Sequence, residues 1–234
     1  MEGITLCEFK KFCRSFDVKY EINDNIIQFN KYAFFNCKAE FIFLPEYITD
    51  EKNNKKLKLR LPNFCSCFFQ NCSAVDISIK IKDTSNVTHM TGMFADCISL
   101  RNVNIDDFNT SNVKDMSDLF YDCFSLRMVN MSNFNTKNVI SIAHMFENCE
   151  SLLEVNMSNL DTANVITMRS LFENCTSLKT VDLANLDTSS LEDAERMFKN
   201  CIQLQDTKIP YKIKALSQVC LGSKIHRRTY KNKI

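Results

Sequence analysis

The sequence predicts an α/β solenoid of about seven coils, each with one short parallel strand and one short helix. Three observations predict it. A unit of 26 residues occurs four times over residues 83–186, and a fifth, weaker copy begins at Asp187. Each copy changes from a helical to an alternating apolar spacing. One cysteine recurs at a constant interval, as Cys97, Cys123, Cys149, Cys175 and Cys201. Such a period marks units that bury their apolar faces only by stacking on one another.

The first half of each copy has helical spacing. In the first copy the apolar residues lie at i, i+3, i+6, i+7 and i+10, as Val87, Met90, Met93, Phe94 and Cys97. This pattern is one stripe of a helix of about ten residues. Asparagine or serine precedes the stripe in every copy and is expected to cap it, as Asn86, Asn112, Asn138, Asn164 and Ser190.

The second half of each copy is predicted to be a turn followed by a strand. Asp96 or its equivalent precedes each cysteine, and Asp and Asn tolerate a left-handed turn better than other residues except glycine. After the turn, Leu100, Val103 and Ile105 are expected to point inward, with polar residues between them pointing outward. The chain has only three glycines, so side chains of another kind must make these turns.

The repeated motif is specific. The run C-x-S-L-x-x-V-N-x, then Phe or Leu, then D/N-T-x-N-V-x-x-M-x-x-M-F-x-x-C, resembles the BspA-like leucine-rich repeats of bacterial and protist surface proteins. The resemblance is strong from residue 83 to about 210 and weak over the fifty residues before. It implies a leucine-rich-repeat-like solenoid with a stacked parallel sheet, a role in attachment to other proteins and no catalytic residues.

Three segments are predicted. Residues 1–82 form an N-terminal cap with two degenerate repeats and a charged surface loop from Tyr47 to Lys58. Residues 83–212 hold the regular repeats. Residues 213–234 form a C-terminal cap helix and a basic tail. Formal charge follows the same division, at +3 for residues 1–82, −10 for 83–206 and +8 for 207–234. An acidic coil region with a basic tail is not neutral toward charged partners.

The sequence contains opposing indications of the cellular compartment of the protein. No run approaches the roughly 18 apolar residues of a membrane span. The chain starts without a basic region followed by an apolar one, so no secretory signal is predicted. Five of the twelve cysteines share one core position, which favours buried, reduced thiols over disulfides. These features favour the cytoplasm, whereas the family resemblance points to the cell surface.

Enzymatic and metal sites are not predicted, and no cofactor is expected. The best metal candidate is Cys65-x-Cys67-x4-Cys72, but no matching Cys or His pair follows at a usual interval. The methionines, at helical spacing beside the phenylalanines, fit core packing better than a soft metal site. Glycine-rich phosphate loops and the nucleophile elbow G-x-S-x-G are absent from the sequence.

The sequence therefore predicts a protein-binding solenoid whose outward strand face holds the site. Its partner is expected to be a protein with a basic or polar extended surface, with no small-molecule substrate. The predicted site residues are Asn104, Asp106, Asn130, Glu154, Asn156 and Asp182. The alternative is a binder of nucleic acid or an anionic membrane that acts through the basic tail. The acidic coil region opposes this alternative, because it repels a polyanion.

Overall fold

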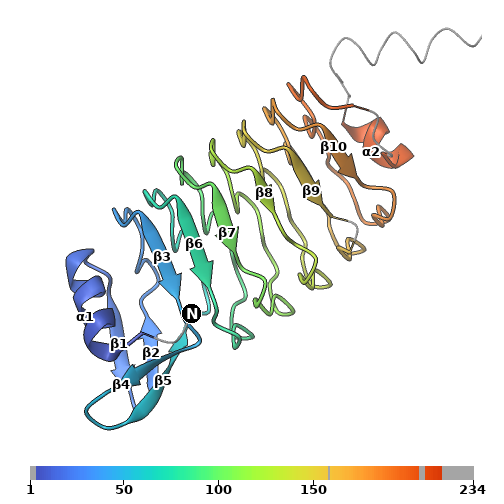
Figure 1. Cartoon of the computed structure of the whole chain (residues 1–234). Helices are drawn as coiled ribbons and strands as arrows, with labels where there is room; N and C mark the ends of the chain where they lie inside the picture. The colour runs from blue at the N-terminus through green and yellow to red at the C-terminus, as the bar shows by residue number, and fades with distance from the viewer. Residues whose placement is uncertain (1–3, 158, 206–208, 218–234) are drawn as a thin grey trace, which may run out of the picture.

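The protein is a repeat fold in which successive coils lie side by side, closed by a helix at each end (Figure 1). The computed structural model describes residues 4–157, 159–205 and 209–217. The helices are α1 (Leu6–Ser15) and α2 (Tyr211–Leu216). The strands are β1 (Tyr20–Asn23), β2 (Ile26–Phe29), β3 (Phe41–Leu44), β4 (Tyr47–Asp50), β5 (Lys55–Arg60), β6 (Asp76–Ile79), β7 (Asn102–Asn104), β8 (Met128–Val129), β9 (Glu154–Asn156) and β10 (Thr180–Asp182).

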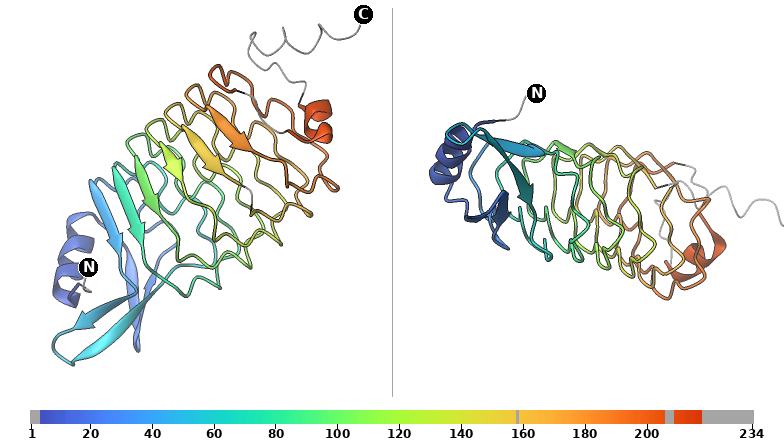
Figure 2. Two further views of the ribbon diagram at one scale, coloured as in Figure 1. Left: turned by 45° about the vertical axis from the view of Figure 1, so that its right-hand side comes forward. Right: turned by 90° about the horizontal axis from the view of Figure 1, so that it is seen from below.

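Parallel pairing joins the coils on two sides. On one side β3, β6 and β7 form one three-stranded sheet, and β8, β9 and β10 form another. On the other side, single parallel bridges run from Phe64 through one residue of each later coil as far as Asp193. Figure 2 shows the resulting stack from two further directions. Parallel pairing thus joins neighbouring coils on both flanks, with offsets of 25 or 26 residues in the regular region and of 35 residues between β3 and β6.

The predicted helices of the repeats are wrong: residues 91–96 and their equivalents are successive turns. In the first coil, Met93, Ala95 and Cys97 donate their N–H groups to carbonyls three residues back. The alternate N–H groups, of Gly92, Phe94 and Asp96, donate instead to the next coil at 2.8–3.0 Å. An α-helix needs every N–H to bond four residues back, so half of these donors are committed elsewhere.

Two residues with left-handed backbone conformation bend the chain in each regular coil. Gly92 and Asp96 have φ of 60° and 59°, and the same two positions are left-handed in the next four coils. The predicted left-handed residue before each cysteine is confirmed, as Asp96, Asp122, Asn148, Asn174 and Asn200. The apolar spacing resembled that of a helix because a chain that turns every four residues also returns its apolar side chains to one face.

The predicted N-caps have another role. The side-chain amide of Asn112 donates to the main-chain oxygen of Ser85, one coil earlier, at 2.7 Å, and Asn138 and Asn164 repeat the contact. A buried threonine adds a second cross-coil link. Thr110 Oγ1 donates to Asn135 O at 3.1 Å and accepts from Asn135 N at 2.8 Å. These side chains satisfy backbone groups that no helix or wide sheet satisfies.

The N-terminal cap contains a mixed sheet in the order β1-β2-β5-β4, covered by α1. A capping box between Thr5 and Glu8 begins α1, and Phe9 and Cys13 lie in the core. The charged loop predicted from Tyr47 to Lys58 is wrong at its ends, where β4 and β5 form an antiparallel hairpin. The charges concealed an alternating pattern, because Leu57 and Leu59 are buried between exposed lysines.

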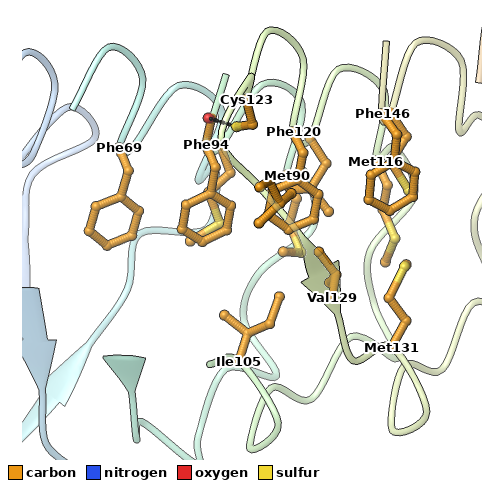
Figure 3. Close-up of a cluster of buried hydrophobic side chains, with 14 of the residues drawn as sticks. Phe69, Met90, Phe94, Ile105, Met116, Phe120, Cys123, Val129, Met131 and Phe146 are labelled. Atoms are coloured by element: carbon orange, nitrogen blue, oxygen red, sulfur yellow. Dashed lines mark hydrogen bonds between the residues drawn. The ribbon is translucent and has the colours of Figure 1, made fainter. Parts of the chain in front are cut away.

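The core is a column of side chains that follows the stack (Figure 3). The stacked phenylalanine rings have centroids 5.2–5.7 Å apart and interplanar angles of 1–9°, through Phe69, Phe94, Phe120, Phe146, Phe172 and Phe198. The repeat methionines predicted as core are buried beside them. At the far end, α2 buries Ile213, two residues after it begins. The predicted basic tail lies outside the described residues.

Candidate functional site

The outward face of the strands carries three parallel columns of side chains. The pairing register places Met128 opposite Glu154, Glu154 opposite Thr180, and Asn156 opposite Asp182. One column is therefore Asn102, Met128, Glu154 and Thr180, and another is Asn104, Asn130, Asn156 and Asp182. The third precedes the strands and holds Arg101, Arg127, Leu153 and Lys179, all exposed. We call these twelve residues the strand face.

Several predicted site residues also organise the backbone that follows each strand. Asn130 Oδ1 accepts from Ser132 N at 3.1 Å, and Asp182 Oδ1 accepts from Ala184 N at 3.0 Å. Asn104 Oδ1 accepts a hydrogen bond from Lys80 Nζ at 3.0 Å. These bonds restrict the conformational freedom of the side chains.

Asp106 and Asn130 join the two halves of the strand face. Asn130 Nδ2 donates to Asp106 Oδ1 at 2.9 Å, and Asn133 Nδ2 donates to Asp106 O at 3.2 Å. These bonds connect the coil of β7 to the coil of β8, and those two strands belong to different sheets. Asp106 is half-buried, so its first role is to connect coils. Glu154 and Asp182 are exposed and offer negative charge at the surface.

The basic column is a feature that the sequence reasoning missed. Arg101, Arg127 and Lys179 place three positive charges beside the amide and carboxylate column, so the strand face is not uniformly acidic. The signal was present in the run L-x-x-V, where Leu100 is buried and the next two residues are both exposed. No prediction was made from the sequence for Arg101 and its equivalents. Met128, with 55% of its surface exposed, adds an apolar patch among these charges.

The opposite flank carries a shallow pocket lined by Asn138, Ile140, Asn164, Ile166, Ser190 and Glu192. Ile140 and Ile166 are 49% and 43% exposed in neighbouring coils. Asn138 and Asn164 are held by their cross-coil hydrogen bonds, so the pocket floor is part of the scaffold. This flank offers a matched surface against which the strand face can be tested.

One set of polar residues has the composition of a catalytic triad but not its geometry. Asp118, His144 and Ser170 occupy the same left-handed position in three successive coils. Ser170 is buried and donates Oγ to Glu173 Oε2 at 2.8 Å, while His144 Nδ1 lies 2.5 Å from Glu147 Oε2. Within the described residues, no hydrogen bond joins His144 to Ser170, so the two side chains are not arranged as in a catalytic triad.

Glu173 is a buried carboxylate with three donors. Arg196 Nη2 and Lys199 Nζ contact its Oε1 at 2.5 and 3.0 Å, and Ser170 contacts Oε2. Burial acts to raise the pKa of Glu173, but the hydrogen bonds from Arg196, Ser170 and Lys199 outweigh it and lower that pKa below its ordinary value. The hydrogen-bonding capacity of this carboxylate is satisfied within the fold. Its contacts link the fourth regular repeat to the fifth.

The thiols of the predicted metal candidate have separate partners. Cys65 Sγ donates to Pro62 O at 3.2 Å, Cys67 is half-buried, and Cys72 interacts with Cys37. In the described ranges, no group of three or more His, Cys, Asp or Glu side chains is placed to hold a metal ion. Neither of the two described helices has the length and apolarity needed to cross a membrane.

Comparison with known proteins identifies one family. A family model described as "Mycoplasma protein of unknown function, DUF285" matches residues 63–155 and again residues 126–220. Together the two matches cover more than half of the chain. No curated protein matches the sequence at a significant level.

Similar solved structures include two leucine-rich repeat proteins and one leucine rich cell surface protein. A protein from Bacteroides ovatus ATCC 8483 is 19% identical, with a TM-score of 0.45, over 82% of this chain and 52% of its own. This chain therefore spans about half the length of that protein. The T. pallidum protein TpLRR is 17% identical, with a TM-score of 0.44, over 98% of this chain and 97% of its own. A cell surface protein from Faecalibacterium prausnitzii A2-165 is 15% identical, with a TM-score of 0.18, over 86% and 96%.

The names of these proteins agree with the resemblance to BspA-like leucine-rich repeats that the sequence motif indicates. All three TM-scores lie below 0.5.

Proposed function

We propose that this chain, which belongs to the family described as "Mycoplasma protein of unknown function, DUF285", is a non-enzymatic protein-binding solenoid that uses its strand face. One observation carries the proposal. The twelve side chains of this face stand in three columns, positioned by the strand register. Adjacent strands lie about 4.8 Å apart, so an extended polypeptide that crosses the strands meets the same three columns in every coil.

The chemistry of the columns indicates the partner. The column of Asn104, Asn130, Asn156 and Asp182 offers amide and carboxylate groups, and Asp106 and Glu154 add negative charge beside it. The basic column offers Arg101, Arg127 and Lys179. A partner with polar and charged groups of both signs, including basic groups opposite Glu154 and Asp182, complements this surface. Its association should weaken as salt is raised, because the charges on both sides are exposed.

The test uses a library of random linear peptides selected on the full-length protein. Peptides that bind the wild type should lose affinity for the variant Met128→Ser with Glu154→Lys, measured by fluorescence anisotropy. Both side chains are exposed, so the variant should keep its melting temperature. The matched control is Ile140→Ser with Glu192→Lys, which makes the same chemical changes on the opposite flank.

The outcomes separate three answers. Loss of binding only in the strand-face variant supports the proposal. Loss only in the control variant assigns binding to the flank pocket and overturns it. Selection of no peptide by the wild type also counts against an extended polypeptide partner. The alternative function through the basic tail has no support from the described residues, and removal of residues 222–234 should leave strand-face binding unchanged.

A further inference from the structure

The flank opposite the strand face carries a column of side chains of its own. Backbone hydrogen bonds fix its register, because each N–H from Lys114 onward donates to the main-chain oxygen one coil earlier, at 2.8–2.9 Å, along Thr88, Lys114, Ile140, Ile166 and Glu192. Neighbouring members therefore lie about 4.8 Å apart. The last four are exposed, and we call them the flank column.

The order of charged and apolar groups distinguishes the flank column. Its two middle members, Ile140 and Ile166, are 49% and 43% exposed and line the shallow pocket of this flank. Their apolar area leaves water only if another surface covers it, and such burial is favourable. Lys114 and Glu192 lie one coil beyond them on either side, and within the described residues neither side chain forms an ion pair. The column thus presents a positive group, two apolar groups and a negative group in sequence.

This order is complementary to itself. A two-fold axis that crosses the flank column at right angles, midway between Ile140 and Ile166, places a second copy of the chain antiparallel to the first. Lys114 of each copy then meets Glu192 of the other, since both lie one and a half coil spacings, or about 7 Å, from the axis. Each Ile140 meets Ile166 of the other copy in the same way. An axis along the column would bring like charges together, so the charges select the antiparallel arrangement.

The columns on either side of the flank column are compatible with the same axis. Asn138 meets Asn164 of the other copy, and two side-chain amides can exchange hydrogen bonds. On the other side Asp115 meets Asp193, which are like charges. Both carboxylates are half-buried, each accepts a backbone hydrogen bond within its own chain, and Asp193 also contacts Arg169 at 3.7 Å. These two aspartates therefore mark the edge of the surface that a second copy can cover.

We propose that this flank is a self-association surface, on which a second copy of the chain docks antiparallel through the flank column. The column spans three coil spacings, or about 14 Å. A contact of this length is small for a permanent dimer, so association is weak and depends on protein concentration. The strand face lies on the other side of each coil and stays open in both copies. This inference goes beyond the proposed function and does not depend on it.

The experiment is sedimentation velocity of the full chain, at loading concentrations from about 1 μM to about 1 mM. The average mass should rise with concentration from that of one chain to that of two. Lys114→Glu places a carboxylate opposite Glu192 at both ends of the antiparallel pair, so the dissociation constant should rise by about tenfold or more. Glu192→Lys should weaken association to a similar extent, because ammonium groups then face each other at both ends.

A mixture of the two single variants tests the antiparallel pairing directly. In a mixed pair each end again joins one carboxylate to one ammonium group. The mixture of Lys114→Glu with Glu192→Lys should therefore associate about as tightly as the wild type, whereas neither variant does so alone. A partner of another kind on this flank would not produce that recovery.

The matched control is Lys11→Glu, which makes the same charge change on the exposed surface of α1 and should leave association unchanged. All three variants should keep the melting temperature of the wild type, because the substituted side chains are exposed. The proposal is overturned if the wild type keeps the mass of one chain at every concentration. It is equally overturned if Lys114→Glu associates as tightly as the wild type, or if the mixture of the two variants fails to associate.

Discussion

The N-terminal cap and the regular coils pack aromatic rings in different ways. In the cap, Phe9 meets Tyr20 at 64° and Phe29 meets Phe68 at 77°, both edge to face. From Phe94 to Phe198 the rings are nearly parallel. Isolated aromatic pairs favour edge-to-face or offset geometries, and the cap adopts them because each ring has its own surroundings. In the coils the repeat imposes one orientation on every ring, so packing is uniform rather than individually adjusted.

The two regions also satisfy their backbone differently. The cap uses hairpins of four paired residues, as between β1 and β2 or β4 and β5. The regular strands are only two or three residues long, and side chains of asparagine and threonine supply the remaining cross-coil bonds. A repeat with short strands can therefore be stable when each coil repeats the same polar links. The predictions below test this difference.

The largest effect is expected from Phe146→Ala, in the middle of the ring column. The substitution removes a fully buried side chain between Phe120 and Phe172 and leaves a cavity that the uniform stack cannot close. The free energy of unfolding should fall by about 3–5 kcal/mol, measured by urea denaturation. A loss below about 1 kcal/mol would show that the column relaxes as freely as a loosely packed surface.

A smaller effect is expected from Thr110→Val, which keeps the shape but removes the buried hydroxyl. Asn135 then loses a donor to its oxygen and an acceptor for its N–H. The free energy of unfolding should fall by about 1–3 kcal/mol. Thr180→Val, on the exposed surface of β10, is the control and should change stability by less than about 0.5 kcal/mol. Equal losses of stability in the two variants would mean that the cross-coil hydrogen bonds of the threonines do not compensate for the short strands.

The smallest effect concerns Glu173→Gln, followed against pH. The folded-state pKa of Glu173 is lowered, so the folded protein binds fewer protons at this group than the unfolded chain does. Its contribution is complete above the unfolded pKa, near 4.5, and is lost as pH falls through the lower folded value. The wild type should exceed the variant by about 1 kcal/mol at pH 7, since Arg196 and Lys199 are partly exposed, and the difference should vanish in strong acid.

The exposed Glu195→Gln is the comparison for this prediction, because Glu195 contacts Arg169 at the surface. Its stability difference from the wild type should stay below about 0.5 kcal/mol at every pH. If the two variants behave alike, the buried position of Glu173 has no special weight and the fourth and fifth coils are linked by the backbone and core alone.

The regular coils were largely predictable from the sequence because one pattern is repeated. Buried positions such as Phe94 and Cys97, and the left-handed residue Asp96, follow from spacing and residue type. The secondary structure of residues 91–96 did not follow, because its hydrogen bonds go to the next coil and local spacing does not report them. The hairpin of β4 and β5 was missed because exposed lysines outnumber the two buried leucines.

Less of the candidate site than of the regular coils could be predicted from the sequence. The register of Glu154, Asn156 and Asp182 follows from the repeat, and the structure places them in neighbouring strands. The column of Arg101, Arg127 and Lys179 required knowing that two consecutive residues point outward before each strand.

The cross-coil hydrogen bonds of the regular region each reach only the adjacent coil, between residues about one repeat apart. Removing or duplicating one complete 26-residue unit therefore rebuilds the same contacts at the new junction. Adding or removing whole units would therefore lengthen or shorten the protein in steps of 26 residues. Each step changes the number of strand-face rows, and thus the length of partner that the surface can cover, without a compensating substitution elsewhere.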